Sequence, residues 1–134
     1  MRIIGYIRVS TDKQVSEGVS IAAQRVKLEA YAVAMDLDLV EIIVDAGESA
    51  KTMDRPGLER VIAALTDGTA DGLLVTKLDR LTRSVRDLGD MIENFFSDRP
   101  RVRQSALLSV GDSIDTRSAG GRLVLNVLMS VAQW

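Results

Sequence analysis

Short apolar runs alternate along this chain with segments of helical periodicity, and this alternation limits the folds available to it. Four runs have the length and composition of strands: residues 2–9, 39–44, 72–76 and 105–110. Strands separated by helices are typical of a parallel sheet with helices packed on it. We therefore predict one α/β domain with a mostly parallel central sheet of about four to five strands.

Three predicted helices carry recognisable end signals. Ser20 and Ser84 are expected N-caps, the second with Asp87 in an arrangement that resembles a capping box, and Pro56 suits a first helical turn. Gly68 is expected to end the second helix in a left-handed cap. The apolar positions expected to face the core are Ile21, Leu28, Ala32, Met35, Leu58, Val61, Ile62, Leu65, Leu88, Met91, Ile92, Phe95 and Phe96.

The last predicted helix, from about residue 118, is apolar on every side rather than along one stripe. Such a helix must be covered all round, either by another protein at an interface or by burial across the sheet, and the sequence favours neither. Because the chain stops at Trp134 without a cap, we expect residues 1–134 to be a domain truncated within this helix. The candidate interface residues are Leu123, Val127, Leu128, Val131 and Trp134.

Cysteine and histidine are both absent from the sequence. The chain therefore has no thiol nucleophile, and it lacks the commonest general base and the commonest metal ligand. A net charge of −2 argues against strong autonomous nucleic-acid binding, although local basic clusters still allow a phosphate site. Any chemistry must use hydroxyl, lysine, arginine or carboxylate groups.

Polar side chains gather where three of the predicted strands end. In an open α/β sheet, ligands bind outside the carboxyl ends of the strands, so these residues are expected to share one edge. They are Arg8 and Ser10 at the end of the first strand, Ser49 and Arg55 after the second, and Lys77, Asp79, Arg80 and Arg83 after the third.

A hydroxyl surrounded by arginines suits attack on a phosphodiester. The transition state gathers negative charge on the phosphorus oxygens, and guanidinium groups bind such oxygens with paired hydrogen bonds. Nearby arginines would also favour the ionised form of Ser10 in place of a histidine base. Asp79 could either orient an arginine or protonate the leaving oxygen.

Each of these residues also has an ordinary structural interpretation. Ser10 could be a turn or N-cap residue, and Arg80 and Arg83 could lie on a solvated helix face. Arg55 could simply be exposed beside Pro56. Only their joint occurrence at three strand ends favours an anion site built around a nucleophile.

Several motifs, in order along nearly the whole chain, resemble those of the resolvase/invertase family of serine site-specific recombinases. The stretch from Glu17 to Ile21 is more similar to the large serine integrases and transposon-type members than to the small resolvases. The motifs are Tyr6-Ile-Arg8-Val-Ser10-Thr11-x-x-Gln14, Glu17-Gly-Val-Ser-Ile21-x-x-Gln24, Asp54-Arg55-Pro56-Gly57-Leu58, Lys77-Leu-Asp-Arg-Leu-x-Arg83-Ser84 and Ile114-Asp-Thr-x-x-Ala-x-Gly-Arg122.

The resemblance implies that Ser10 attacks the DNA backbone and forms a transient 5′-phosphoserine link. It implies double-stranded DNA as the partner, and strand exchange in a homotetramer assembled from dimers through the C-terminal helix. No metal or other cofactor is implied, and the expected setting is the cytoplasm, for a bacterial or phage-encoded protein that acts on DNA, with no membrane partner. The residues implied to bind the scissile phosphate, to support it or to contact DNA are Arg8, Arg55, Arg80, Arg83, Asp79, Gln14, Gln24, Ser49, Lys77 and Arg122.

Two departures from the family pattern affect the expected activity. In the family the interface helix continues to a Glu-Arg pair whose arginine belongs to the active site, and separate domains bind DNA. The sequence ends before that pair and contains no such domain. We therefore expect residues 1–134 alone to fold but to recombine DNA poorly or not at all.

Two other functions use the same residues differently. A metal-dependent nuclease or phosphatase could hold Mg²⁺ with Asp12, Asp45 and Asp79, and its activity would survive Ser10→Ala but not a chelator. A non-catalytic flavodoxin-like regulatory module could use Asp45 or Asp79 as a phosphoacceptor. That module would tolerate Arg80→Ala and Arg83→Ala.

Overall fold

A five-stranded sheet runs through the centre of the computed structural model, which describes residues 1–9, 20–46, 55–82 and 84–132. The strands are β1 (Arg2–Val9), β2 (Asp38–Ala46), β3 (Gly72–Val75), β4 (Ala106–Ser109) and β5 (Ile114–Asp115), in the spatial order β2-β1-β3-β4-β5. The first four are parallel, and β5 is antiparallel to β4. The predicted fold class is confirmed.

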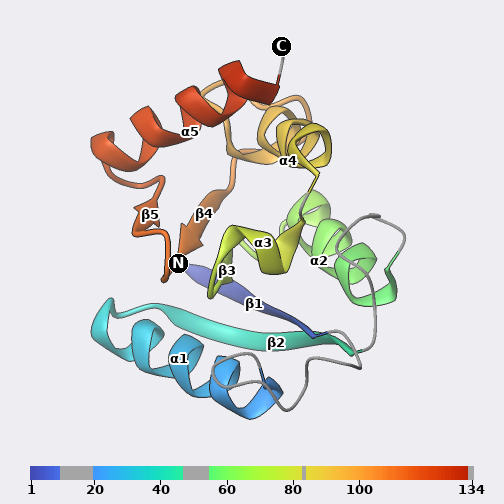
Figure 1. Cartoon of the computed structure of the whole chain (residues 1–134), viewed down its shortest axis with the longest axis vertical. Coiled ribbons are helices and arrows are strands. Elements are labelled where there is room, and N and C mark those ends of the chain that lie inside the picture. The colour runs from blue at the N-terminus through green and yellow to red at the C-terminus, as the bar shows by residue number, and fades with distance from the viewer. Residues whose placement is uncertain (10–19, 47–54, 83, 133–134) are drawn as a thin grey trace.

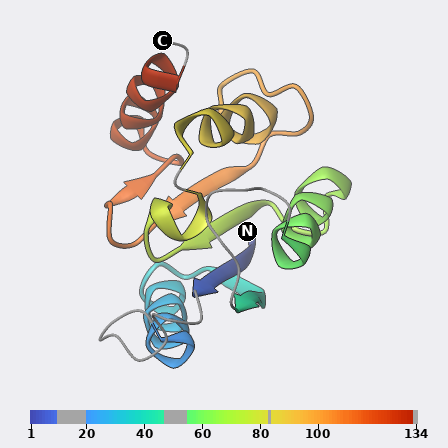
Figure 2. The ribbon, with the colours of Figure 1, turned by 45° about the vertical axis from the view of Figure 1, so that its right-hand side comes forward.

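Helices cover both faces of this sheet (Figures 1 and 2). They are α1 (Ile21–Ala34), α2 (Pro56–Asp67), α3 (Leu78–Leu81), α4 (Val85–Met91), its π-helical continuation η2 (Ile92–Phe96) and α5 (Ala119–Ala132). On one face, α1 packs Leu28 against Ile3 and Ile7 of β1. On the other, residues of α2, α4, η2 and α5 belong to the same core cluster as Ile4 and Tyr6. Alternate residues of β1 therefore belong to two different cores, as expected for a strand buried on both sides.

The predicted caps determine where most of these helices begin and end. The Ser20 hydroxyl oxygen accepts a hydrogen bond from the Ala23 amide at 3.1 Å, and Ser84 accepts one from the Asp87 amide at 3.2 Å. Gly68 ends α2 at φ 84°, where a side chain would be strained. The resemblance to a capping box at Ser84 is only half right, because its own amide donates to Thr82 Oγ1 rather than to Asp87.

Met35 was expected on the buried face of α1, and this expectation is wrong. The helix ends at Ala34, and the Met35 amide closes the last turn by donating to the Tyr31 carbonyl at 2.9 Å. Asp36 then takes a left-handed conformation at φ 55°, which turns the chain toward β2. Met35 is left 42% exposed as a consequence.

The C-terminal helix α5 is not buried across the sheet. It lies beside α4 (Figures 1 and 2) and buries Leu125 in the core, with Leu128 and Met129 partly buried against it. Leu123 and Val127 are 65% and 56% exposed. Burial across the sheet is therefore excluded for this helix, and its apolar outer side faces solvent. None of the helices among the described residues is long and apolar enough to cross a membrane.

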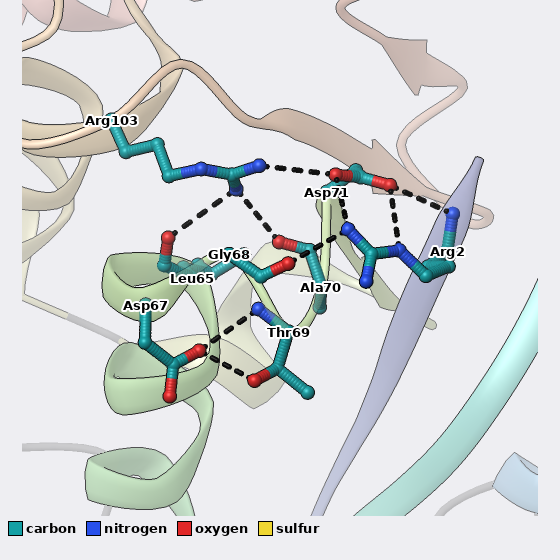
Figure 3. Close-up of polar contacts among 8 residues, drawn as sticks. All are labelled: Arg2, Leu65, Asp67, Gly68, Thr69, Ala70, Asp71 and Arg103. Atoms are coloured by element: carbon teal, nitrogen blue, oxygen red, sulfur yellow. Dashed lines mark hydrogen bonds and ion pairs between the residues drawn. The ribbon is translucent and has the colours of Figure 1, made fainter.

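An ion-pair network joins the amino ends of β1 and β3 to the loop before β4 (Figure 3). The Asp71 carboxylate accepts hydrogen bonds from the Arg2 amide at 3.1 Å, from Arg2 Nε at 3.3 Å and from Arg103 Nη2 at 3.1 Å. Both guanidinium groups also donate to backbone carbonyls, Arg2 to Gly68 and Arg103 to Ala70. These bonds, those from the Arg2 side chain and amide first, lower the pKa of Asp71 to about 2.

Asp71→Asn is expected to lower the free energy of unfolding by about 1 kcal/mol at pH 7, because these pairs are partly solvated. A carboxylate with a lowered pKa stabilises the fold fully above its unfolded value near 4 and loses this effect as the pH falls toward about 2. The difference between the two proteins should therefore shrink below about pH 4 in urea unfolding curves. Asp90→Asn, on the exposed side of α4, serves as control. Equal stabilities at every pH would contradict this prediction.

Candidate active site

Arg55, the residue that precedes α2, is completely buried. Its guanidinium carbon lies 5.6 Å from the centre of the Tyr6 ring, and Nη2 donates a hydrogen bond to the Leu81 carbonyl. Within the described part of the chain, Nε and Nη1 have no hydrogen-bond partner. A buried cation with unsatisfied N–H groups costs folding energy, so this arrangement suits a side chain that completes its bonding with an anion.

Asp45, at the carboxyl end of β2, holds the start of α2 in place. Its Oδ1 accepts from the Gly57 amide at 2.7 Å, and its Oδ2 accepts from the Leu58 amide at 2.9 Å. Arg55 offers no side-chain cap of its own, so Asp45 acts as the N-cap of α2 from a neighbouring strand. Its negative charge also lies at the positive end of the helix dipole.

Tyr6 completes this buried arrangement from β1. Its hydroxyl group donates to Asp45 Oδ2 at 2.7 Å. Burial, followed by this hydrogen bond, raises the pKa of Tyr6 well above its usual value, so the hydroxyl stays a proton donor at neutral pH. The ring lies against the Arg55 guanidinium, and this contact adds a cation–π attraction. Tyr6 and Asp45 together hold Arg55 in position, Tyr6 through its ring and Asp45 by fixing the start of α2.

Gly57 permits the close approach between β2 and α2. A Cβ atom on Gly57 would lie 2.6 Å from Asp45 Oδ1, closer than real Cβ contacts come. Any side chain at this position would push the carboxylate away from the helix start. The glycine of the Asp54-Arg-Pro-Gly-Leu58 motif therefore has a steric role beside the arginine.

Arg8 lies at the end of β1 and is 3% exposed. Its Nη2 donates to the Asp79 carbonyl at 3.3 Å, and its own carbonyl accepts from Gln24 Nε2 of α1 at 3.4 Å. The register of the sheet pairs Arg8 with Asp45 on β2. Both predicted arginines of the first two strand ends are therefore buried, and Arg8 lies on the strand next to the carboxylate that caps α2.

The short helix α3 supports both of these arginines through its backbone. The Asp79 carbonyl accepts from Arg8, and the Leu81 carbonyl accepts from Arg55. Arg80 is 15% exposed, with Nε 3.9 Å from Asp79 Oδ1, whereas the Asp79 side chain is half exposed. Lys77 is exposed at the N-cap position of α3. The prediction that these strand ends share one edge is confirmed for Arg8, Arg55, Asp79 and Arg80.

The structure does not bring all predicted site residues to this edge. Arg122 lies at the opposite edge, where its Nε donates to the Thr116 carbonyl at 3.0 Å. There it lines a half-open cleft of about 610 Å³ with residues that precede β3 and β4, Asp71 and Ser105 among them. Five predicted residues fall outside the described ranges: Ser10, Gln14, Ser49, Arg83 and Trp134.

Sequence reasoning missed the roles of Tyr6 and Asp45 in this site. Asp45 was considered only as a metal ligand or a phosphoacceptor. An aspartate at the carboxyl end of a strand, followed by a helix start without a capping side chain, was the available signal. With three donors on its two oxygens and 4% exposure, Asp45 is poorly placed to hold Mg²⁺ or to accept a phosphoryl group. No group of three carboxylates suited to a metal occurs among residues 1–9, 20–46, 55–82 and 84–132.

A mostly parallel sheet covered by helices, with buried arginines at the carboxyl ends of its strands, defines an α/β domain whose candidate site lies at those strand ends. The family model described as "Resolvase, N terminal domain" matches residues 3–134, and the chain belongs to this family. The DNA-invertase of Escherichia phage P1 is 37% identical over 131 residues, 98% of this chain and 60% of that protein. The transposon Tn2501 resolvase of Escherichia coli is 34% identical and covers 99% of this chain.

Solved structures show the same similarity. The N-terminal catalytic domain of TP901-1 integrase matches with a TM-score of 0.86 and 36% identity, covering 99% of this chain and 95% of that one. A resolvase family site-specific recombinase from Streptococcus pneumoniae matches with a TM-score of 0.73 and 27% identity, covering 99% and 86%. The chain spans about 60% of the length of the curated relatives it matches.

Proposed function

We propose that this chain is the catalytic domain of a serine site-specific recombinase, and that Ser10 is its nucleophile. The observation that supports this most directly is the buried pair Arg8 and Arg55 at one edge of the sheet, with unsatisfied N–H groups on Arg55. Ser10 follows the last residue of β1 in the sequence and is two residues from Arg8. The names of the relatives, invertase, resolvase and integrase, describe site-specific rearrangement of DNA.

In the proposed reaction, Ser10 Oγ forms a bond to the phosphorus of a DNA phosphodiester. The bond from phosphorus to the 3′ oxygen breaks, which leaves a 5′-phosphoserine link and a free 3′-hydroxyl. The serine loses its proton and the departing 3′ oxygen gains one, so the step is balanced without an oxidant or a metal. Attack by a 3′-hydroxyl from another DNA end then reverses the step and releases Ser10.

The arginines supply the stabilisation that this step needs. Arg8, Arg55, Arg80 and Arg83 would bind the non-bridging oxygens of the phosphate, where charge accumulates in the transition state. Because Arg8 and Arg55 are held in place before DNA arrives, little reorganisation is needed. Further residues proposed to support the site or to contact DNA are Asp79, Gln14, Gln24, Ser49, Lys77 and Arg122.

Assembly of several copies would occur through α5. Leu123, Val127 and Val131 form an exposed apolar surface on the outer side of this helix, each more than half exposed. A second copy of the same helix would remove this surface from water, and we propose that dimers and a tetramer on DNA form in this way. Analytical ultracentrifugation of the protein with its recombination sites should detect these species; a monomer under all conditions would contradict the proposal.

A cleavage assay separates this function from the metal-dependent alternative. The protein that contains this chain, at its natural length, is incubated with DNA from the ends of its own element in the presence of a chelator. Cleavage should continue with the chelator and should be abolished by Ser10→Ala. Cleavage that needs a divalent metal and survives Ser10→Ala would instead support the nuclease.

A further inference from the structure

The turn between β4 and β5, residues 110–113, is attached to the start of α3. Asp112 Oδ2 accepts hydrogen bonds from the Leu78 amide at 2.8 Å and from Ser109 Oγ at 2.7 Å. The Gly111 amide donates to the Thr76 carbonyl at 2.6 Å. A Cβ on Gly111 would lie 2.7 Å from Lys77 Cγ, so the turn fits closely against the segment that leads into α3.

Such support matters because α3 is only four residues long. A single helical turn is unstable by itself, since its hydrogen bonds do not repay the cost of ordering its backbone. Its first N–H groups have no partner within the helix, and Lys77 provides no side-chain cap. Asp112 supplies that cap from another part of the chain, and the buried Ser109 hydroxyl orients the carboxylate.

The position of α3 in turn determines the geometry of the arginines. Arg8 donates to the Asp79 carbonyl and Arg55 donates to the Leu81 carbonyl, both on the backbone of this helix. Arg80 is part of the helix itself. A displacement at the start of α3 would therefore move three guanidinium groups together.

We propose that Asp112 is a positioning residue for DNA cleavage, which acts by holding α3 and through it Arg8, Arg55 and Arg80. This inference rests on the proposed function, because the arginines matter here only as ligands of the scissile phosphate. Among the described residues, Asp112 makes no hydrogen bond to Arg8, Arg55 or Arg80; its bonds are with the Leu78 amide and the Ser109 hydroxyl. Its influence on the reaction is therefore indirect.

The test measures DNA affinity and the single-turnover cleavage rate separately, in the protein at its natural length. Asp112→Ala should lower the cleavage rate about 10- to 100-fold, because small misplacements of catalytic groups have effects of this size. Its DNA affinity should stay within about twofold, since Asp112 is not part of the DNA-binding set. Hydrogen exchange at the amides of residues 78–82 should become faster, because α3 loses its cap.

Asp112→Asn is the conservative variant that separates positioning from general damage. Both hydrogen bonds are accepted by the same oxygen, so an asparagine carbonyl in that place retains them, and most of the cleavage rate should return. Asp67→Ala is the matched control. Asp67 also accepts a backbone hydrogen bond in a turn, from the Thr69 amide at 2.8 Å, but at the opposite edge of the sheet. The Asp67→Ala variant should therefore cleave DNA at the wild-type rate.

A double-mutant cycle with Arg80→Ala gives a further readout that mere destabilisation would not produce. If Asp112 acts through α3, its removal should have a smaller effect once Arg80 is absent. Full cleavage by Asp112→Ala, unchanged exchange in α3 or strictly additive effects would each overturn the inference. If the wild-type protein binds its DNA but forms no serine-linked product, the proposed function itself is wrong.

Discussion

Asp45→Ala is expected to lower the free energy of unfolding by about 3 kcal/mol, among the largest effects of any single substitution in the described part of this chain. The carboxylate satisfies three donors, the Tyr6 hydroxyl and the amides of Gly57 and Leu58, in a site that is almost fully buried. Alanine leaves these donors without partners and removes the cap of α2. Urea unfolding measures the loss directly.

Two further variants make this expectation specific. Asp45→Asn keeps the shape but replaces one acceptor oxygen by a donor, so it should be destabilised less than alanine and still measurably. Asp38→Ala, at the exposed opposite end of β2, is the control and should change stability by less than about 0.5 kcal/mol. A loss below about 1 kcal/mol for Asp45→Ala would mean that water replaces the carboxylate.

Arg55→Lys is expected to slow DNA cleavage by about 100-fold or more while the protein remains folded. Lysine keeps the positive charge but has no planar fork, so it cannot reach the Leu81 carbonyl and a phosphate oxygen in the same geometry. The measurement is the single-turnover cleavage rate with saturating protein.

The matched control for this substitution lies on α2, the helix that Arg55 precedes. Arg60 is exposed and pairs with Glu41 at the surface, so Arg60→Lys should cleave at close to the wild-type rate. If Arg55→Lys also cleaves normally, the buried guanidinium is a structural group and not a phosphate ligand. Circular dichroism and thermal unfolding of both variants separate a folding defect from a catalytic one.

The parts of the fold that were predictable from sequence are those with a local signal. The composition and length of the apolar run at residues 2–9 predicted β1 with its observed bounds. The chemistry of helix caps predicted three helix ends, at Ser20, Pro56 and Gly68. The strand β5 has only two residues and α3 only four, too few for any periodicity to appear. The π-helical turn at Ile92–Phe96 keeps the apolar positions of an α-helix, so sequence pattern does not separate the two.

The candidate site was predictable in its arginines but not in what holds them. Arg8 and Arg55 were identifiable because Arg8 lies at the end of a strand and Arg55 directly precedes a helix that begins at Pro56. The contacts of Asp45 with α2 and of Asp112 with α3 join residues 12 and 34 positions apart, and they depend on which strands become neighbours. Arg122 was grouped with the site by resemblance alone, and in this structure it lies at the opposite edge of the sheet.

Trapping the covalent intermediate shows directly whether Ser10 attacks DNA. The protein at its natural length is incubated with its own DNA ends and a chelator, denatured, and digested for peptide mass spectrometry. We expect a denaturation-resistant adduct with the 5′-phosphate on Ser10 and a free 3′-hydroxyl on the other DNA end, and no adduct with Ser10→Ala. DNA that is bound but never linked to Ser10, or cleavage without any adduct, would contradict it.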